Sequence, residues 1–231
     1  ESTASLYSSI GKSEAIFLCF NFTGLRRYPA LFDVWGNYFW DAKDVACVNI
    51  LVDHPYFYFE LFPLSPTNFH VINIDRYHER YMHRFYPQIP TGPFMPSAGT
   101  SLYPSGDFPL FENRTLPIVF TGNYTPPSTF DSYFQRLGKE YEMFFHNILD
   151  DLLANPNQPD DIVIERHIRQ EIPESSDYDM HIAISNMIFI DSYIRFYFRG
   201  KVVQTILDAD FPVHCVGAGW DLLPHSPSSR L

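Results

Sequence analysis

Five predominantly apolar runs are spaced along the chain, and each one ends in a polar or glycine-containing turn. They cover residues 15–20, 46–52, 69–74, 117–121 and 211–216. The first of them is apolar at every position, which is typical of a strand buried on both faces, as in a parallel sheet. We therefore predict five strands of this kind.

Helical patterns lie between these runs. The sequence predicts helices over residues 31–39 and 77–85, the second ended by Pro87. From Phe130 to Leu152, apolar residues recur at helical spacing and predict one long helix. Further helices are expected over residues 160–172, 179–198 and 201–207. Strands alternating with helices predict an α/β fold with right-handed crossovers.

Residues 90–116 are rich in proline, glycine and serine, which forbid a long helix there and are typical of a connection between domains. We expect a first Rossmann-like domain over residues 1–94, a connection over 95–116 and a second domain over 117–231. The second has only two strands, separated by a helical insertion of about 130–208. A two-stranded domain cannot stand alone, so we expect the chain to be part of a larger enzyme.

The formal net charge of −11 argues against a nucleic-acid partner recruited by charge. Three cysteines lie in apolar, strand-like runs and are expected to be reduced and buried. No signal peptide or membrane span is visible, so the expected compartment is the cytoplasm.

Polar residues follow the first three predicted strands, at the edge where parallel sheets bind ligands. Asp53 and His54 could act as base and orienter for an acceptor hydroxyl, or could cap a turn before a proline. Asn21 and Asp75 lie at the same edge, and Asp75, Arg76 and His78 carry the same ambiguity. Arg76 could bind a phosphate or pair with a neighbouring carboxylate.

The fourth strand leads into a glycine turn, Thr121-Gly122-Asn123-Tyr124, before a predicted helix. Backbone amides at such a turn can hold a pyrophosphate, although a tight turn without a ligand fits the sequence equally. The last strand leads into Gly217-Ala218-Gly219-Trp220, which lacks the third glycine of a dinucleotide fingerprint, so NAD and FAD are rejected.

Two charged motifs have structural explanations. Asp208-Ala209-Asp210 matches a DxD metal motif, but it precedes a strand and so lies at the wrong end of the sheet. Asp191, Arg195 and Arg199 are spaced by four and predict an ion ladder along a helix. A role for Arg195 or Arg199 in binding phosphate is the less favoured alternative.

Five short motifs are spread from the second predicted strand to the last. They are Leu51-Val52-Asp53-His54-Pro55, Ile74-Asp75-Arg76 with His78, Arg84-Phe85-Tyr86-Pro87, Phe120-Thr121-Gly122-Asn123-Tyr124, and residues 213–221. Together they resemble the CgeB-like bacterial glycosyltransferases, GT-B proteins of the glycosyltransferase group 1 type that are related to the spore maturation protein CgeB. The resemblance covers about residues 15–221.

This resemblance implies a GT-B-like α/β fold: two Rossmann-like, parallel-sheet domains facing each other across a cleft, the second incomplete here. The acceptor would bind the first domain at Asn21, Asp53, His54, Asp75 and Arg76. A nucleotide-diphosphate sugar would bind the second domain at the two turns, through Thr121, Gly122, Asn123, Tyr124, Gly217, Gly219 and Trp220. GT-B enzymes need no bound metal in general, and the nucleotide sugar is a substrate rather than a cofactor.

The expected function is sugar transfer from a nucleotide-diphosphate donor to a hydroxyl or amide of a glycan or protein acceptor. Catalysis would rest on positioning and on stabilising the departing diphosphate. The alternative is a non-catalytic module on the same scaffold that binds carbohydrate or protein.

Overall fold

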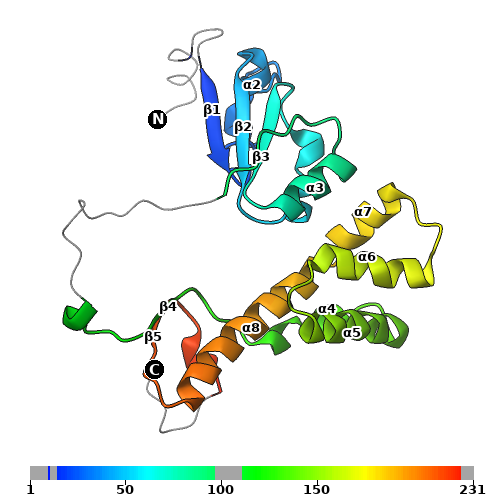
Figure 1. Ribbon diagram of the computed structural model, residues 1–231. Coiled ribbons are helices and arrows are strands. Elements are labelled where there is room, and N and C mark those ends of the chain that lie inside the picture. Colours follow the sequence, from blue (N-terminus) through cyan, green and yellow to red (C-terminus); the bar gives the residue numbers. More distant parts are fainter. Residues whose placement is uncertain (1–9, 11–14, 97–110, 225–231) are drawn as a thin grey trace. The chain divides into compact units, whose positions relative to one another are not determined.

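The computed structural model describes residues 10, 15–96 and 111–224 (Figure 1). Contacts divide the chain into two compact units. The first unit comprises residues 1–99 and 176–185, and the second comprises residues 100–175 and 186–231. The expected second domain therefore gives up one helical segment to the first unit. Much of the expected connection, residues 97–110, lies outside the described residues.

The first unit is built on a parallel sheet of three strands (Figure 1). Its strands are β1 (Ile16–Phe20), β2 (Ala46–Leu51) and β3 (Phe69–Asn73), in that spatial order. All three coincide with predicted strands, and their parallel pairing is confirmed. Beyond β3, a single parallel bridge joins Val71 to Thr91 and extends the sheet by one more segment.

Short helices connect these strands. They are the 3₁₀ helix η1 (Pro29–Leu31) and α2 (Phe39–Ala42) after β1, then η2 (Pro55–Tyr58) and η3 (Phe62–Leu64) after β2. The helix α3 (Arg76–Phe85) follows β3 and confirms the helix expected before Pro87.

The helix predicted over residues 31–39 was wrong. A tight turn replaces its middle, where the Asp33 carboxylate accepts hydrogen bonds from the backbone N–H groups of Trp35 and Asn37. Gly36 adopts a left-handed conformation with φ of 82°. An aspartate that bonds nearby amides competes with helix formation, which explains the miss.

The two faces of the sheet in the first unit differ in burial, most clearly at β1. Cys47 and Val71 are fully buried on the covered face. On the opposite face of β1, however, Ile16, Leu18 and Phe20 are all more than half exposed. The prediction that the first strand is buried on both faces was therefore wrong, because an apolar run shows that a strand is apolar and not how many layers cover it.

The second unit contains a parallel pair of strands and a set of helices. Strand β4 (Val119–Thr121) pairs with β5 (His214–Val216), so both predicted strands are confirmed in shortened form. The short helices are η4 (Phe111–Asn113), η5 (Pro127–Phe130), α4 (Asp131–Gln135) and η6 (Trp220–Leu222). The long ones are α5 (Lys139–Ala154), α6 (Asp160–Glu171) and α8 (Ile188–Asp208).

Three helix boundaries differ from the sequence-based expectation. The single helix expected from Phe130 is broken before α5 by Gly138, whose φ of 96° does not fit an α-helix. The helix expected over residues 179–198 is two helices, α7 (Asp177–Ser185) in the first unit and α8 in the second. The helix expected over residues 201–207 is the end of α8. The helix expected over 160–172 is confirmed as α6.

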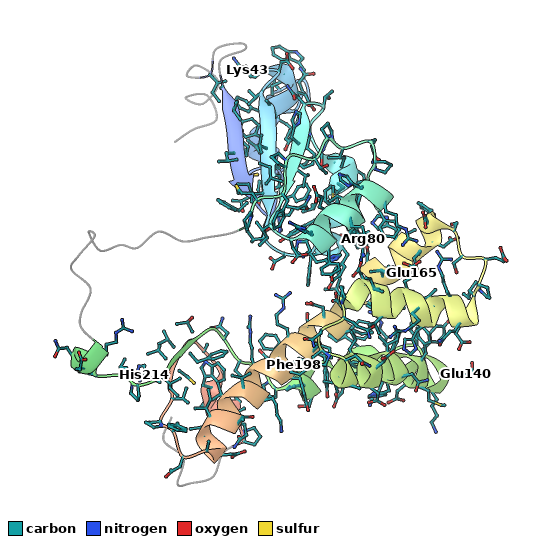
Figure 2. All side chains as sticks on the ribbon, viewed as in Figure 1. Lys43, Arg80, Glu140, Glu165, Phe198 and His214 are labelled. Atoms are coloured by element: carbon teal, nitrogen blue, oxygen red, sulfur yellow. The ribbon has the colours of Figure 1, made fainter. Side chains whose placement is uncertain are left out.

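Two apolar clusters hold the second unit together. Helices α5 and α6 pack against each other, and their side chains lie between them in Figure 2. Ile148 of α5 and Val163 of α6 are fully buried. The other cluster packs the last turns of α8 against β4 and β5, around Tyr124, Val203 and Trp220. Within the described residues, no helix is long and apolar enough to span a lipid bilayer.

Candidate functional site

Asn21 and Asp53 meet at the carboxyl edge of the first sheet. The Asn21 amide nitrogen donates to Asp53 Oδ2 at 2.9 Å, and its Oδ1 accepts from the Val52 backbone N–H at 3.0 Å. Asn21 has a φ of 50°, a left-handed conformation that asparagine tolerates better than most residues. The turn after β1 thus delivers an amide that clamps the end of β2.

Tyr58 completes this group, and sequence reasoning missed it. Its hydroxyl donates to Asp53 Oδ2 at 3.1 Å from the 3₁₀ helix η2. Two donors on one oxygen fix the orientation of the half-buried Asp53 carboxylate. The only hint in the sequence is that Tyr58 lies five residues after Asp53. This spacing does not predict a contact unless the path of η2 is already known.

His54 does not share the position of Asp53. Its ring is buried, and its Nδ1 accepts a hydrogen bond from the Tyr56 backbone N–H, which makes it the cap of η2. Burial, followed by the nearby charges of His78 and Arg80, holds the pKa of His54 well below its ordinary value. A buried, neutral imidazole stacked on Tyr56 is a structural cap, so the structure supports the capping alternative for His54 over a role as catalytic orienter.

Asp75 and Arg76 begin α3. Asp75 is its N-cap, with its carboxylate accepting from the Tyr77 backbone N–H at 2.6 Å. The guanidinium of Arg76 lies over the ring of Phe94, 5.4 Å from its centroid. Both residues are at the predicted edge, but the structure gives Asp75 a local capping role.

In the second unit, the two predicted turns are bonded to each other. The amide of Gly122 donates to the Val216 carbonyl, and the amide of Tyr124 donates to the Ala218 carbonyl, both at 2.9 Å. Because these N–H groups are already used, they do not form the phosphate cradle that the sequence suggested. This corrects the assignment of Gly122 and Tyr124 as amide donors to a pyrophosphate.

Side chains reinforce the contact between the turns. Asn123 Oδ1 accepts from the Ala218 N–H at 2.9 Å, and the indole of Trp220 donates to the Gly122 carbonyl at 2.7 Å. Gly219 is needed because a side chain there would overlap the Tyr124 carbonyl oxygen. Trp220 and Gly219 therefore have structural roles that the sequence presented as donor contacts.

A cation lies beside this pair of turns. The Arg199 guanidinium, from α8, donates to the Asn123 carbonyl at 3.1 Å. Arg195 instead pairs with Asp191 at 3.0 Å, so the predicted ladder is real for that pair only. Thr121 and Asn123 are exposed at the same place. Arg199 therefore lies beside the exposed part of the turns, and its hydrogen bond to Asn123 ties α8 to them.

The Asp208-Ala209-Asp210 motif lies where helix α8 ends. Asp208 ends α8 and accepts a hydrogen bond from Gln204 at 2.6 Å. Among the residues described, no group of three or more histidine, cysteine, aspartate or glutamate side chains is arranged to hold a metal ion.

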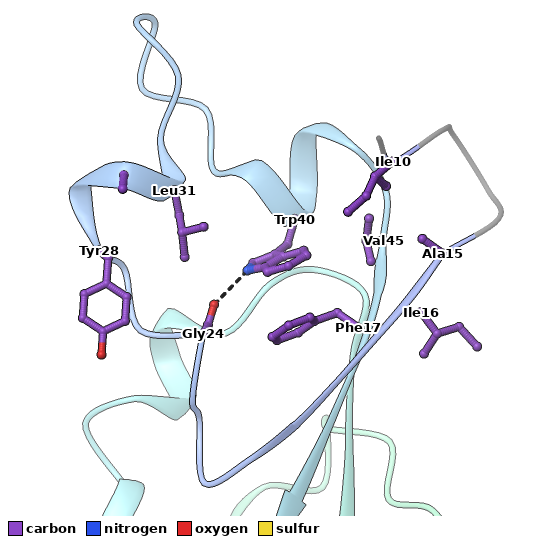
Figure 3. A pocket seen from close by; sticks show the side chains of 10 residues that line it. Ile10, Ala15, Ile16, Phe17, Gly24, Tyr28, Leu31, Trp40 and Val45 are labelled. Atoms are coloured by element: carbon purple, nitrogen blue, oxygen red, sulfur yellow. Dashed lines mark hydrogen bonds between the residues drawn. The ribbon is translucent and has the colours of Figure 1, made fainter. Parts of the chain in front are cut away.

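An apolar pocket of about 440 Å³ opens in the first unit (Figure 3). Phe17 and Trp40 stack in it with centroids 4.2 Å apart, and Trp40 donates to the Gly24 carbonyl. Ile10, Ile16 and other apolar residues complete the lining. None of the predicted site residues lines this pocket, so it is separate from the edge that carries Asn21 and Asp53.

Comparison with known proteins finds no matching family model, no matching curated protein and no matching solved structure. The functional argument therefore rests on the residues and their geometry.

Proposed function

We propose that the chain belongs to an enzyme that transfers a sugar from a nucleotide-diphosphate donor to a hydroxyl or amide of a glycan or protein. The observation that carries this proposal is the Asn21–Asp53–Tyr58 group at the carboxyl edge of a parallel sheet. Ligands of α/β sheets bind at this edge, and a carboxylate held in one orientation there can accept a proton.

Asp53 has the role of general base in this proposal. As the acceptor oxygen attacks the anomeric carbon, its proton passes to the Asp53 carboxylate, and the bond between the sugar and the diphosphate breaks. Asn21 and Tyr58 touch only the carboxylate and serve as positioning residues. Positioning matters because much of the rate of such a transfer comes from alignment of the reacting groups.

On the second unit, the proposal assigns the donor diphosphate to Arg199 and to the exposed Thr121 and Asn123. Arginine binds phosphate oxygens through two parallel hydrogen bonds, and a cation stabilises a departing diphosphate. This replaces the amide cradle, whose N–H groups are used within the turns. The similarity to CgeB-like proteins supports a nucleotide sugar as the donor.

The test of the donor site is calorimetric titration of the protein with UDP, GDP and their sugars. Arg199→Met should weaken diphosphate binding at least tenfold, because it removes the cation and keeps the length of the side chain. Arg195→Met is the matched control on the same helix, since Arg195 pairs with Asp191, and should bind as the parent does. Absence of binding by every nucleotide would contradict the enzyme proposal.

The test of the acceptor site is Asp53→Asn, which retains the shape of the side chain and removes the base. Sugar transfer should fall at least a hundredfold, while nucleotide affinity should not change. Equal transfer by Asp53→Asn and the parent would remove Asp53 from the chemistry.

One observation favours the alternative of a non-catalytic binding module. The amides expected to hold phosphate are engaged in the turn pair, as they would be in a scaffold that binds no nucleotide. The same titrations separate the two, because a module of this kind would bind a glycan or a protein and no nucleotide.

A further inference from the structure

Helix α7 belongs to the first unit, although the helices before and after it in the chain, α6 and α8, belong to the second. The chain enters the first unit at Ser176 and leaves it after Ser185. Ser176 caps the helix, accepting a hydrogen bond from the Asp179 N–H at 3.1 Å. Helix α7 thus has its own start signal.

Helix α7 is held by one apolar and one polar set of contacts. Met180 and Ile184 are buried, and α7 packs on α3 and η2. At its start, Asp177 accepts from the Arg84 guanidinium of α3, with a distance of 3.1 Å from Nε. This ion pair is partly exposed and contributes little on its own.

His181 lies at the centre of the contact. Its Nε2 is 2.8 Å from the Tyr86 hydroxyl, and its ring stacks on Phe85 with centroids 5.2 Å apart. Tyr81 and Phe59 complete the ring of aromatic neighbours. A neutral imidazole suits these aromatic contacts, whereas an imidazolium would lose part of its hydration in this half-buried position.

We propose that α7 is a pH-sensitive latch, docked on the first unit at neutral pH through His181 and released when His181 is protonated in mild acid. Burial lowers the pKa of His181, in the direction that this mechanism needs. In the released helix, His181 would titrate near its ordinary value of about 6.5. Docking is therefore complete above this pH and weakens as the pH falls below it.

Apart from the histidines His54 and His78, the other charged and titratable groups around His181 do not provide the same switch. On α7 itself, Asp177 is paired with Arg84 and Asp179 is bonded to Ser176. On α3 and its C-cap, the neighbours are Tyr81, Tyr86 and Arg84, which do not titrate between pH 5 and 8. On the η2 side, His54 lies beyond Tyr81, with ring centroids 4.7 Å apart, and next to His78.

The test is hydrogen exchange of the α7 amides, residues 177–185, from pH 8 to pH 5, corrected for intrinsic exchange. Protection should fall by up to tenfold per pH unit below about 6.5 in the parent. His181→Phe keeps the aromatic contacts and removes the titrating group, so its corrected protection should not depend on pH. The amides of β2 are the internal control, because they exchange only when the whole first unit unfolds, for example after protonation of His54. They should remain protected at a pH at which the α7 amides already exchange.

Tyr86→Phe provides a second variant, because it removes only the hydroxyl bonded to His181. It should lower α7 protection at every pH and keep the pH dependence. Two outcomes overturn the proposal: corrected α7 protection in the parent that is the same at pH 8 and pH 5, or loss of α7 and β2 protection together. A His181→Phe protein with the pH dependence of the parent would do the same.

Discussion

Gly217 lies directly against the carbonyl group of Gly122, so that a side chain at position 217 would overlap the Gly122 oxygen. Ninety-five residues separate the two glycines in sequence. Gly217 also has a φ of 142°, which side-chain-bearing residues rarely adopt. The close approach and the backbone conformation both exclude any residue but glycine there.

Gly217→Ala should therefore destabilise the second unit by about 2 kcal/mol or more, from overlap and backbone strain together. Gly36→Ala is the matched control, because Gly36 is left-handed but has open space around it. It should cost only about 1 kcal/mol. Urea unfolding followed by circular dichroism measures both, and equal losses would show that the contact with Gly122 is unimportant.

Asn21 combines a left-handed backbone with two side-chain hydrogen bonds, and two substitutions separate these contributions. Asn21→Gly removes the bonds to Val52 and Asp53 and keeps the backbone unstrained, for a loss of about 1–2 kcal/mol. Asn21→Ala adds strain of about 1 kcal/mol. Urea denaturation should give a lower free energy of unfolding for Asn21→Ala than for Asn21→Gly. The reverse order would refute this explanation of the turn.

His54 should make the stability of the first unit depend on pH. Its pKa is lowered in the folded protein, chiefly by burial, so the unfolded chain binds the proton more readily. The contribution is fully present above about pH 6.5 and decreases as the pH falls, by about 1.4 kcal/mol per pH unit at most. His54→Asn can still cap the Tyr56 N–H and should flatten this profile between pH 6.5 and 5. An unchanged slope would assign the effect to other groups.

The three cysteines should differ in reactivity. Burial raises the pKa of Cys19 to about 11 and that of Cys47 to about 12, so neither forms the reactive thiolate at pH 8. Cys215 is only partly buried. A thiol reagent should label Cys215 first and the other two only on unfolding, as mass spectrometry of the labelled peptides would reveal. Rapid labelling of Cys19 in the folded protein would contradict the described burial.

The apolar runs located all five strands, because short and mostly apolar segments that end in turns have few alternatives to a sheet. They did not reveal that Leu18 faces outward, since the number of covering layers is set by other segments. The break at Gly138 was visible as a glycine, but its backbone conformation was not. Asp33 was overlooked because its bonds to Trp35 and Asn37 matter only once the chain has turned.

The candidate site, like the fold, was predicted only in part from the sequence. The rule that parallel strands end at one edge brought Asn21 and Asp53 together correctly. It could not supply Tyr58, which depends on the path of η2. Nor could it show that the Gly122 amide is used, because that depends on the register between β4 and β5, which are far apart in sequence.

The placement of α7 has a practical meaning for dividing this protein. A polypeptide ending at residue 99 would keep all three strands of the first sheet but would lose the helix that packs on α3. Tyr86, now 4% exposed, would lose its His181 partner. A separately expressed first unit therefore needs residues 176–185 joined back to it, for example by a short glycine–serine linker, to fold with its aromatic side chains covered.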